Sequence, residues 1–305
     1  MKEYLENVRC VAPLIHNITN YVTANDVANV LLACGASPIM ADEEAEVEEI
    51  TAHCMGLNLN LGTLNQKKIP AMQKAGKMAN KLGHVVLDPV GVGASSFRKQ
   101  TAEQLLKEVR FDAIRGNISE IKTLASLCGT QEKNSGNMAV SDTMDVEKIT
   151  DKSDHCGKIT GIDGSGRGVD ADNADTVTEE NLAQHISNAK MLSKKLQTIV
   201  AITGAIDLVT DGSSCYVIRN GNPQMGHVTG AGCQLSGILT AFLAANPENK
   251  LQAAAAAVCM MGYAGELAAE KSGQSGSGTY RVSLMDAVSC MDGDILERGA
   301  RYEIR

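Results

Sequence analysis

The sequence is poor in proline, with six in 305 residues, and no Pro-rich or low-complexity linker divides it. Because 44% of the residues are hydrophobic, a chain of this length can bury one large core. We therefore predict a single domain over residues 1–305. The few prolines, together with 29 glycines and many alanines, favour a helix-rich α/β protein over a β-sandwich or a disulfide scaffold.

Basic residues are also in short supply, since 28 Lys and Arg stand against 36 Asp and Glu, for a formal net charge of -8 at pH 7. This balance argues against nucleic acid or an anionic membrane as a partner. No apolar run reaches the roughly 18 residues of a membrane span, and the first residues, MKEYLENVRC, lack the apolar segment of a signal peptide. We therefore expect a cytoplasmic protein with no membrane partner.

Paired cysteines are missing. The nine cysteines are an odd number, spread along the chain without a CxxC pair, and the six histidines show no HxH or HxxxH spacing. Neither a disulfide framework nor a zinc site fits these spacings. We expect most of the cysteines to be small core residues.

Apolar segments separated by amphipathic helices predict the fold. Strands are expected at 37–41, 57–62, 84–91, 111–117 and 198–204. Such βαβ units build a mainly parallel sheet flanked by helices, which binds ligands at the carboxyl ends of its strands. The Gly-Ser-Ser turn within LVTDGSSCYVI, residues 208–218, predicts an antiparallel hairpin at a sheet edge.

Two further segments differ from this pattern. Residues 251–270 form a helix that is apolar on most faces, so it is expected in the core or against a partner subunit. The segment at about 129–165 is polar and rich in Gly, Ser and Asp, which predicts a surface insertion. A lid over a nucleotide is an alternative, but a solvated loop is favoured because long loops cost little free energy.

The segment HVTGAGCQLSGILTAFLAA, residues 227–245, changes character at Cys233. Small residues and glycines precede the cysteine, and leucines at helical spacing follow it. A glycine turn that leads into a helix N-terminus exposes unpaired N–H groups at the positive end of the helix dipole, which suits an anion such as phosphate. Tight helix entry without a ligand is the simpler interpretation of the turn alone.

Polar residues end three of the predicted strands: Asp88 in LDPVGVGAS, Arg115 in IRGNISE and Thr203 in ITG. Phosphoryl transfer needs phosphates neutralised, a metal held by carboxylates and an aligned acceptor hydroxyl. Asp88 and Glu120 are candidates for Mg²⁺, and Arg115 is a candidate for the phosphates. Taken singly, an Asp-Pro turn and an Asn-x-x-Glu helix cap explain the same residues.

The order of these motifs is more specific than any one of them. PLIHNITNYV, GASPIMA, LNLGTL, LDPVGVGASSFR, IRGNISEI, GRGVD, AITGAIDLVTDG, VTGAGCQLS and GSGTYRVSLMDAV span nearly the whole chain. Together they resemble the hydroxyethylthiazole kinases of the ribokinase-like superfamily. The resemblance implies a three-layer sandwich with an antiparallel edge hairpin. It also implies transfer of the ATP γ-phosphoryl group to the hydroxyl of 4-methyl-5-(2-hydroxyethyl)thiazole, with Mg²⁺, in thiamine salvage.

The resemblance further implies a homotrimer with sites at the subunit interfaces, and it assigns roles by motif. Asn20, Met40 and Gly230 are expected at the thiazole, Arg115 and Thr203 at ATP, and Asp88 and Glu120 at magnesium. The anion hole over the transferring phosphoryl group is expected from Gly230, Ala231, Gly232 and Cys233. The insertion at 129–165 lengthens a connection that is usually short in this family.

Most ribokinase-like kinases have Asp where this sequence has Cys233, and the thiazole kinases resemble this chain in having Cys. A thiol at a helix N-terminus is expected to have a lowered pKa and to accept the proton of the alcohol. A small residue that merely fits the helix start is the alternative for Cys233. For the whole chain, the alternatives are a kinase of another heterocyclic alcohol, of pyrimidine or pyridoxal type, and a non-catalytic sensor of thiazole or nucleotide.

Overall fold

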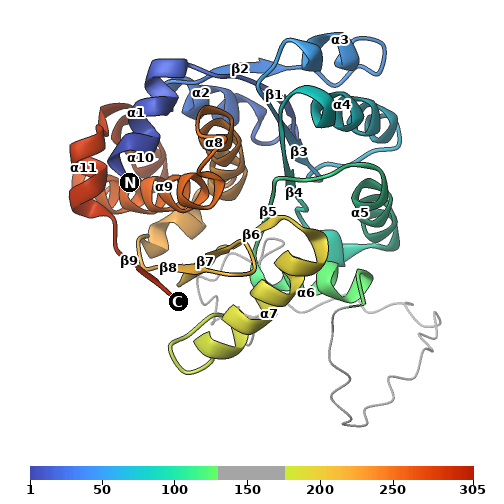
Figure 1. Cartoon of the computed structure of the whole chain (residues 1–305). Helices are drawn as coiled ribbons and strands as arrows, with labels where there is room; N and C mark the ends of the chain where they lie inside the picture. The colour runs from blue at the N-terminus through green and yellow to red at the C-terminus, as the bar shows by residue number, and fades with distance from the viewer. Residues whose placement is uncertain (130–175) are drawn as a thin grey trace, which may run out of the picture.

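The computed structural model describes residues 1–129 and 176–305, and a single twisted sheet runs through it (Figure 1). The predicted insertion at 129–165 lies, except for Gly129, outside the described residues. Within the described residues the sheet has nine strands in the order β2-β1-β3-β4-β5-β6-β7-β8-β9. The strands are β1 (Leu14–Ile18), β2 (Ser37–Met40), β3 (Gly56–Asn60), β4 (His84–Asp88), β5 (Ala113–Gly116), β6 (Ile199–Ile202), β7 (Asp207–Thr210), β8 (Cys215–Ile218) and β9 (Tyr302–Ile304).

Helices cover both faces of the sheet, which confirms the predicted three-layer α/β sandwich (Figure 1). The first face is covered by α1 (Lys2–Val11), α2 (Ala24–Cys34), α8 (Ala231–Ala245), α9 (Lys250–Ser272), α10 (Ser277–Cys290) and α11 (Gly293–Gly299). On the second face lie α3 (Val47–Ala52), α4 (Lys68–Leu82), α5 (Ser96–Glu108), α6 (Ile118–Leu127) and α7 (Leu182–Leu196). Two short 3-10 helices, η1 (Val92–Ala94) and η3 (Pro223–His227), lie in loops.

Alternation along the strands builds two cores from one sheet. Val86 of β4 packs into the core beneath α8 and α9, whereas its neighbours Val85 and Leu87 pack into the core beneath α4 and α5. Successive strand side chains point to opposite faces, so a strand covered on both sides is apolar throughout. This explains why HVVLD has a continuous apolar run before its terminal aspartate.

Most of the predicted elements are confirmed, with two differences at the sheet edges. The five predicted strands are β2 to β6, and Gly35 caps α2 with φ 99° as expected. The 208–218 hairpin is antiparallel, as β7 and β8, but β9 pairs with β8 and forms the edge in its place. The pattern analysis also omitted β1 as a strand, because PLIHNITNYV carries polar residues that are buried only after folding.

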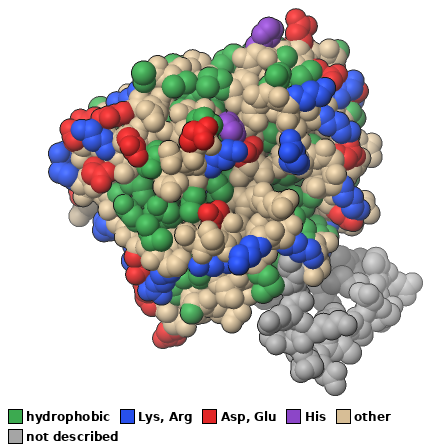
Figure 2. Space-filling view, viewed as in Figure 1, with side chains coloured by type: hydrophobic (Ala, Val, Ile, Leu, Met, Phe, Trp, Pro, Cys, Tyr) green, Lys and Arg blue, Asp and Glu red, His purple; other side chains and the backbone are tan. Residues whose placement is uncertain are grey.

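Helix α9 is the apolar helix predicted at 251–270. By length and composition it could cross a membrane, but 72% of its most apolar window is buried inside the protein. It packs against α8 and α10 and over the antiparallel strands. Its composition is therefore that of a central core helix. On the outside, Figure 2 shows acidic and basic side chains mixed over the face in view.

Candidate active site

The site begins at the glycine turn before α8. Gly230 is the N-cap of this helix with φ 85°, and a Cβ there would lie 2.3 Å from Cγ2 of Thr23. Only glycine fits both the backbone angle and the contact. No side chain caps the helix, so its first-turn N–H groups remain available for an anion, as the sequence predicts. At Gly232 the Arg115 guanidinium lies where a Cβ would stand.

Cys233 follows in the first turn of α8 and is 8% exposed. Its sulfur accepts hydrogen bonds from the side-chain amides of Asn20 and Asn60, each at 3.3 Å. Burial raises the pKa of the Cys233 thiol, and the charge of Asp88 adds to this, while the Asn60 amide and Arg115 oppose it. The predicted lowering of the Cys233 pKa is therefore wrong, because desolvation of a buried thiolate outweighs the favourable helix start.

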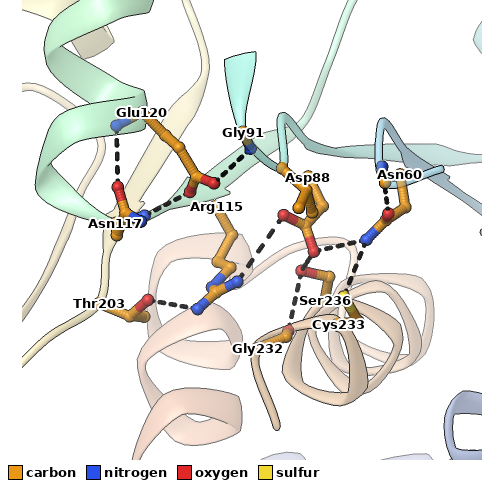
Figure 3. Close-up of polar contacts among 12 residues, drawn as sticks. Asn60, Asp88, Gly91, Arg115, Asn117, Glu120, Thr203, Gly232, Cys233 and Ser236 are labelled. Carbon is orange, nitrogen blue, oxygen red and sulfur yellow. Dashed lines mark hydrogen bonds and ion pairs between the residues drawn. The ribbon is translucent and has the colours of Figure 1, made fainter. Parts of the chain in front are cut away.

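Asp88, the last residue of β4, lies beside this cysteine and is fully buried (Figure 3). Its Oδ2 accepts hydrogen bonds of 2.8 Å from Asn60 and from Ser236 of α8. Its Oδ1 has no hydrogen-bond partner and lies 3.7 Å from Nη1 of Arg115. Burial raises the pKa of Asp88, although Arg115, Ser236 and Asn60 all favour its charged form. Asp88 thus carries one free oxygen next to a guanidinium.

Glu120 serves first as a helix cap. It forms a capping box with Asn117, whose backbone N–H donates to its Oε2 at 2.8 Å, and the N–H of Gly91 donates to its Oε1 at 2.8 Å. Both the predicted cap and proximity to Asp88 are therefore present. Burial raises the pKa of Glu120 to about 7, and the charge of Asp88 contributes to the rise.

Arg115 and Thr203 end the two neighbouring strands β5 and β6 and are in contact. Nη2 of Arg115 donates a 2.6 Å hydrogen bond to Oγ1 of Thr203. The same guanidinium faces Asp88 and the glycine turn at Gly232, so three motifs far apart in the sequence meet at this side chain (Figure 3). A cation beneath a helix N-terminus is suited to phosphate oxygens.

The carboxylates fit a magnesium ion held mainly by water. Among the described residues, no group of three or more His, Cys, Asp and Glu side chains is arranged to hold a metal. The unpartnered Oδ1 of Asp88 and the two oxygens of Glu120, each with a single hydrogen-bond donor, are the acceptors on offer. Mg²⁺ keeps several waters and takes one or two carboxylates, which matches this donor set.

Two other predicted residues have different positions. Asn20 is buried, and both hydrogen bonds of its Nδ2 stay within the protein, to Asn60 and to Cys233. Met40 ends the edge strand β2 in register with Asn17 and is 39% exposed. Asn20 is thus brought to the cysteine, whereas Met40 stands at the rim with an open side chain.

Sequence reasoning missed Asn60, Ser236 and Lys68. Asn60 ends the alternating segment LNLNLG, where its position at a strand end was a usable signal. Lys68 is 3% exposed, and its Nζ donates to the carbonyl of Thr19 at 2.8 Å and pairs with Asp42 at 3.0 Å. It joins the loops that follow β1 and β2, and nothing in the local sequence marks a surface-type residue for such burial.

A separate hollow of about 800 Å³ lies at the amino edge of the parallel strands. Its lining includes Asp112, which pairs with Lys250 at 2.6 Å and with His84 at 3.3 Å. Burial is offset by these two partners, which lower the pKa of Asp112 to about 2. The charged groups satisfy one another, at the opposite end of the strands from Cys233.

Comparisons with known proteins agree with this geometry. The fold is that of small-molecule kinases: pyridoxal kinase from Staphylococcus aureus aligns with a TM-score of 0.55 at 13% identity, over 96% of this chain and 98% of that one. The structure of a hydroxyethylthiazole kinase protein from Pyrococcus horikoshii OT3 aligns with a TM-score of 0.78 at 30% identity, over 99% and 98% of the chains. A model of the hydroxyethylthiazole kinase family matches residues 5–154 and 130–294.

Relatives point the same way. A hydroxyethylthiazole kinase of Clostridium acetobutylicum is 52% identical over 305 residues, which is 99% of each chain, and one of Desulfovibrio desulfuricans is 40% identical over 99% of this chain and 96% of that one. The chain belongs to the hydroxyethylthiazole kinase family. Because the Clostridium relative matches it from end to end, the long connection at 129–165 is not peculiar to this sequence.

Proposed function

We propose that this kinase transfers the γ-phosphoryl group of ATP to the hydroxyl of 4-methyl-5-(2-hydroxyethyl)thiazole, with Cys233 as the proton acceptor. One observation carries the proposal: the Cys233 sulfur lies in the first turn of α8, directly after a glycine turn whose N–H groups are uncapped. A nucleophile's proton acceptor and an anion site therefore occupy the same helix start.

The reaction needs one proton transfer and one displacement. The alcohol oxygen attacks the γ-phosphorus, its proton passes to the Cys233 thiolate, and the bond from the γ-phosphorus to the bridging oxygen breaks so that ADP leaves. The thiol then returns its proton to solvent. Because the transition state is loose, positioning and charge stabilisation carry most of the rate, and the base adds a smaller factor.

Charge on the transferring group is met from two sides. The N–H groups of Gly230, Ala231, Gly232 and Cys233 form the proposed anion hole. Arg115, held by Thr203, faces the same turn and is assigned with Thr203 to ATP. Asp88 and Glu120 would hold Mg²⁺, partly through water, and the ion would neutralise phosphate charge when bound.

The thiazole side of the site is proposed around Asn20, Met40 and Gly230. Tyr21 and Val22, next to Asn20, are 67% and 62% exposed. Large apolar side chains this open, beside the exposed Met40, support the proposed homotrimer, in which a neighbouring subunit covers the site. We place the enzyme in the cytoplasm, as the sequence predicts.

A coupled assay of ADP release tests the proposal. Purified chain, Mg²⁺ and ATP are incubated with the thiazole alcohol, and with pyridoxal and a pyrimidine alcohol as controls, and the phosphorylated product is identified by mass spectrometry. The thiazole alcohol is expected to be the preferred acceptor. Turnover of a control alcohol alone would move the assignment to another kinase of this fold, and tight thiazole binding without ADP would indicate a sensor.

A further inference from the structure

The side-chain amide of Asn60 has only one possible orientation. Its Oδ1 accepts a 2.8 Å hydrogen bond from the backbone N–H of Gly62, a group that can only donate. Its Nδ2 must therefore point the other way, where it donates to Oδ2 of Asp88 at 2.8 Å and to the Cys233 sulfur at 3.3 Å. Asn60 is fully buried, and both hydrogens of the amide are used. The sulfur is thus held as an acceptor.

Asn20 is fixed by the same logic. Its Oδ1 accepts from the backbone N–H of Thr23 at 3.1 Å, so its Nδ2 faces inward and donates to Oδ1 of Asn60 at 3.1 Å and to the sulfur at 3.3 Å. Two amides, each locked by a backbone donor, therefore aim N–H groups at one sulfur atom. A neutral thiol does not require two donors, whereas a thiolate is stabilised by them.

We propose that Asn60 is a positioning residue for the phosphoryl transfer: it anchors to Asp88 and holds the Cys233 sulfur so that negative charge on that atom is accepted in place. This rests on the proposed function, in which Cys233 takes the proton of the alcohol. Asn60 itself touches no reacting atom; it acts through the sulfur.

The surroundings of the sulfur explain why such help is needed. Asp88 and Arg115 are the charged groups that act on Cys233, one against the thiolate and one for it. Burial also opposes the charged form. Asn60 binds Asp88 and the sulfur with the same nitrogen, so it screens the cysteine from the carboxylate while donating to both.

A double-mutant cycle tests the inference. Asn60→Ala is expected to lower kcat about 10- to 100-fold in the wild-type background, with the KM values of both substrates within about 3-fold, since one fixed donor to developing charge is lost. In the Cys233→Ala background the same change is expected to lower kcat less than about 3-fold. An equal loss in both backgrounds would overturn the inference, because Asn60 would then act without the sulfur.

Asn58→Ala is the matched control. Asn58 lies two residues earlier on the same face of β3, is fully buried, and donates to Oδ1 of Asn17 at 3.1 Å instead of to the cysteine. Its variant is expected to lose stability but keep kcat within about 3-fold. If Asn60→Ala does not fold, Asn60→Ser, which removes the amide but keeps a hydroxyl near Asp88, takes its place in the cycle.

Alkylation gives a readout independent of turnover. The rate of iodoacetamide labelling of Cys233, followed by peptide mass spectrometry from pH 6 to pH 10, is expected to reach its midpoint at a higher pH in Asn60→Ala than in wild type and Asn58→Ala. An unchanged midpoint would contradict the inference. A wild-type enzyme that labels normally but does not phosphorylate the thiazole alcohol would instead refute the proposed function.

Discussion

Ser236 donates a hydrogen bond of 2.8 Å to Asp88, although 148 residues separate the two in the sequence. The bond ties the second turn of α8 to the carboxyl end of β4, so the glycine turn at the start of α8 is held against the sheet. Because both groups are buried and paired, they allow one arrangement and penalise others. The position of the cysteine relative to the strand ends follows from this bond.

Gly230→Ala tests the turn itself. The new Cβ would approach Thr23 to 2.3 Å at a backbone φ of 85°, so we expect a loss of about 1 to 3 kcal/mol in the free energy of unfolding and at least about 10-fold in kcat. Denaturant titration and the ADP assay measure both. Gly278→Ala, where no atom lies within 4 Å, is the control and is expected to change little. Wild-type activity in Gly230→Ala would show that the turn tolerates a side chain.

Lys68→Met tests the link between the two substrate loops. Lys68 bonds Thr19 next to Asn20, pairs with Asp42 near Met40, and stands 4.0 Å over the ring of Tyr21. Its loss is expected to raise the KM for the thiazole alcohol about 10-fold and leave the KM for ATP within about 2-fold, as steady-state kinetics would show.

The control for this variant is Lys74→Met on the same helix. Lys74 pairs with Glu44 at 3.0 Å, but both side chains are nearly half exposed, so little change is expected. Equal effects of the two substitutions would mean that Lys68 contributes only general stability.

Asp207→Asn tests a buried carboxyl by its pH dependence. Burial raises the pKa of Asp207 to about 7, with one hydrogen bond from the N–H of Gly204 opposing the rise. A pKa above the unfolded value means that the folded state binds the extra proton, so its contribution is present at low pH and is lost as pH rises through about 7.

Between pH 5 and pH 8 the free energy of unfolding is therefore expected to fall by about 2 to 3 kcal/mol more in wild type than in Asp207→Asn. Urea titrations at several pH values measure the difference. Parallel curves for the two proteins would show that Asp207 does not titrate in this range.

Asp88→Asn tests the magnesium assignment. The substitution removes the charge of the free Oδ1, so the Mg²⁺ concentration at half-maximal rate is expected to rise about 10-fold, with a lower kcat. Asp112→Asn, a carboxyl at the opposite edge of the sheet, is the control. An unchanged magnesium titration in Asp88→Asn would limit Asp88 to a structural role.

The sequence predicted the strands well because their apolar runs are strong, and it predicted the strand-end residues because parallel strands collect them at one edge. Arg115, Thr203 and Asp88 do meet there. The short strand β9 carries too weak a pattern to find, since Tyr302 and Ile304 are partly exposed at the edge.

The pKa of Cys233 could not be judged from sequence for a different reason. Its position at a helix start is local and was predicted, but its burial and its distance from Asp88 depend on how α8 packs on β3 and β4. The same holds for Asn60, whose role appears only when β3 and α8 are side by side. Tertiary contacts decide the charge of a buried group, and no local pattern records them.

The most direct test is kcat at saturating ATP and thiazole alcohol, measured from pH 6 to pH 10 for wild type, Cys233→Ala and Cys233→Asp. Because burial raises the thiol pKa, the wild-type rate is expected to rise with pH as the thiolate fraction grows. Cys233→Ala is expected to be about 10- to 1000-fold slower, and Cys233→Asp to keep substantial activity with a flatter profile, since a carboxylate ionises more readily. An alanine variant as fast as the parent, with chemistry rate-limiting, would make Cys233 a spacer and leave catalysis to the anion hole, Arg115 and magnesium.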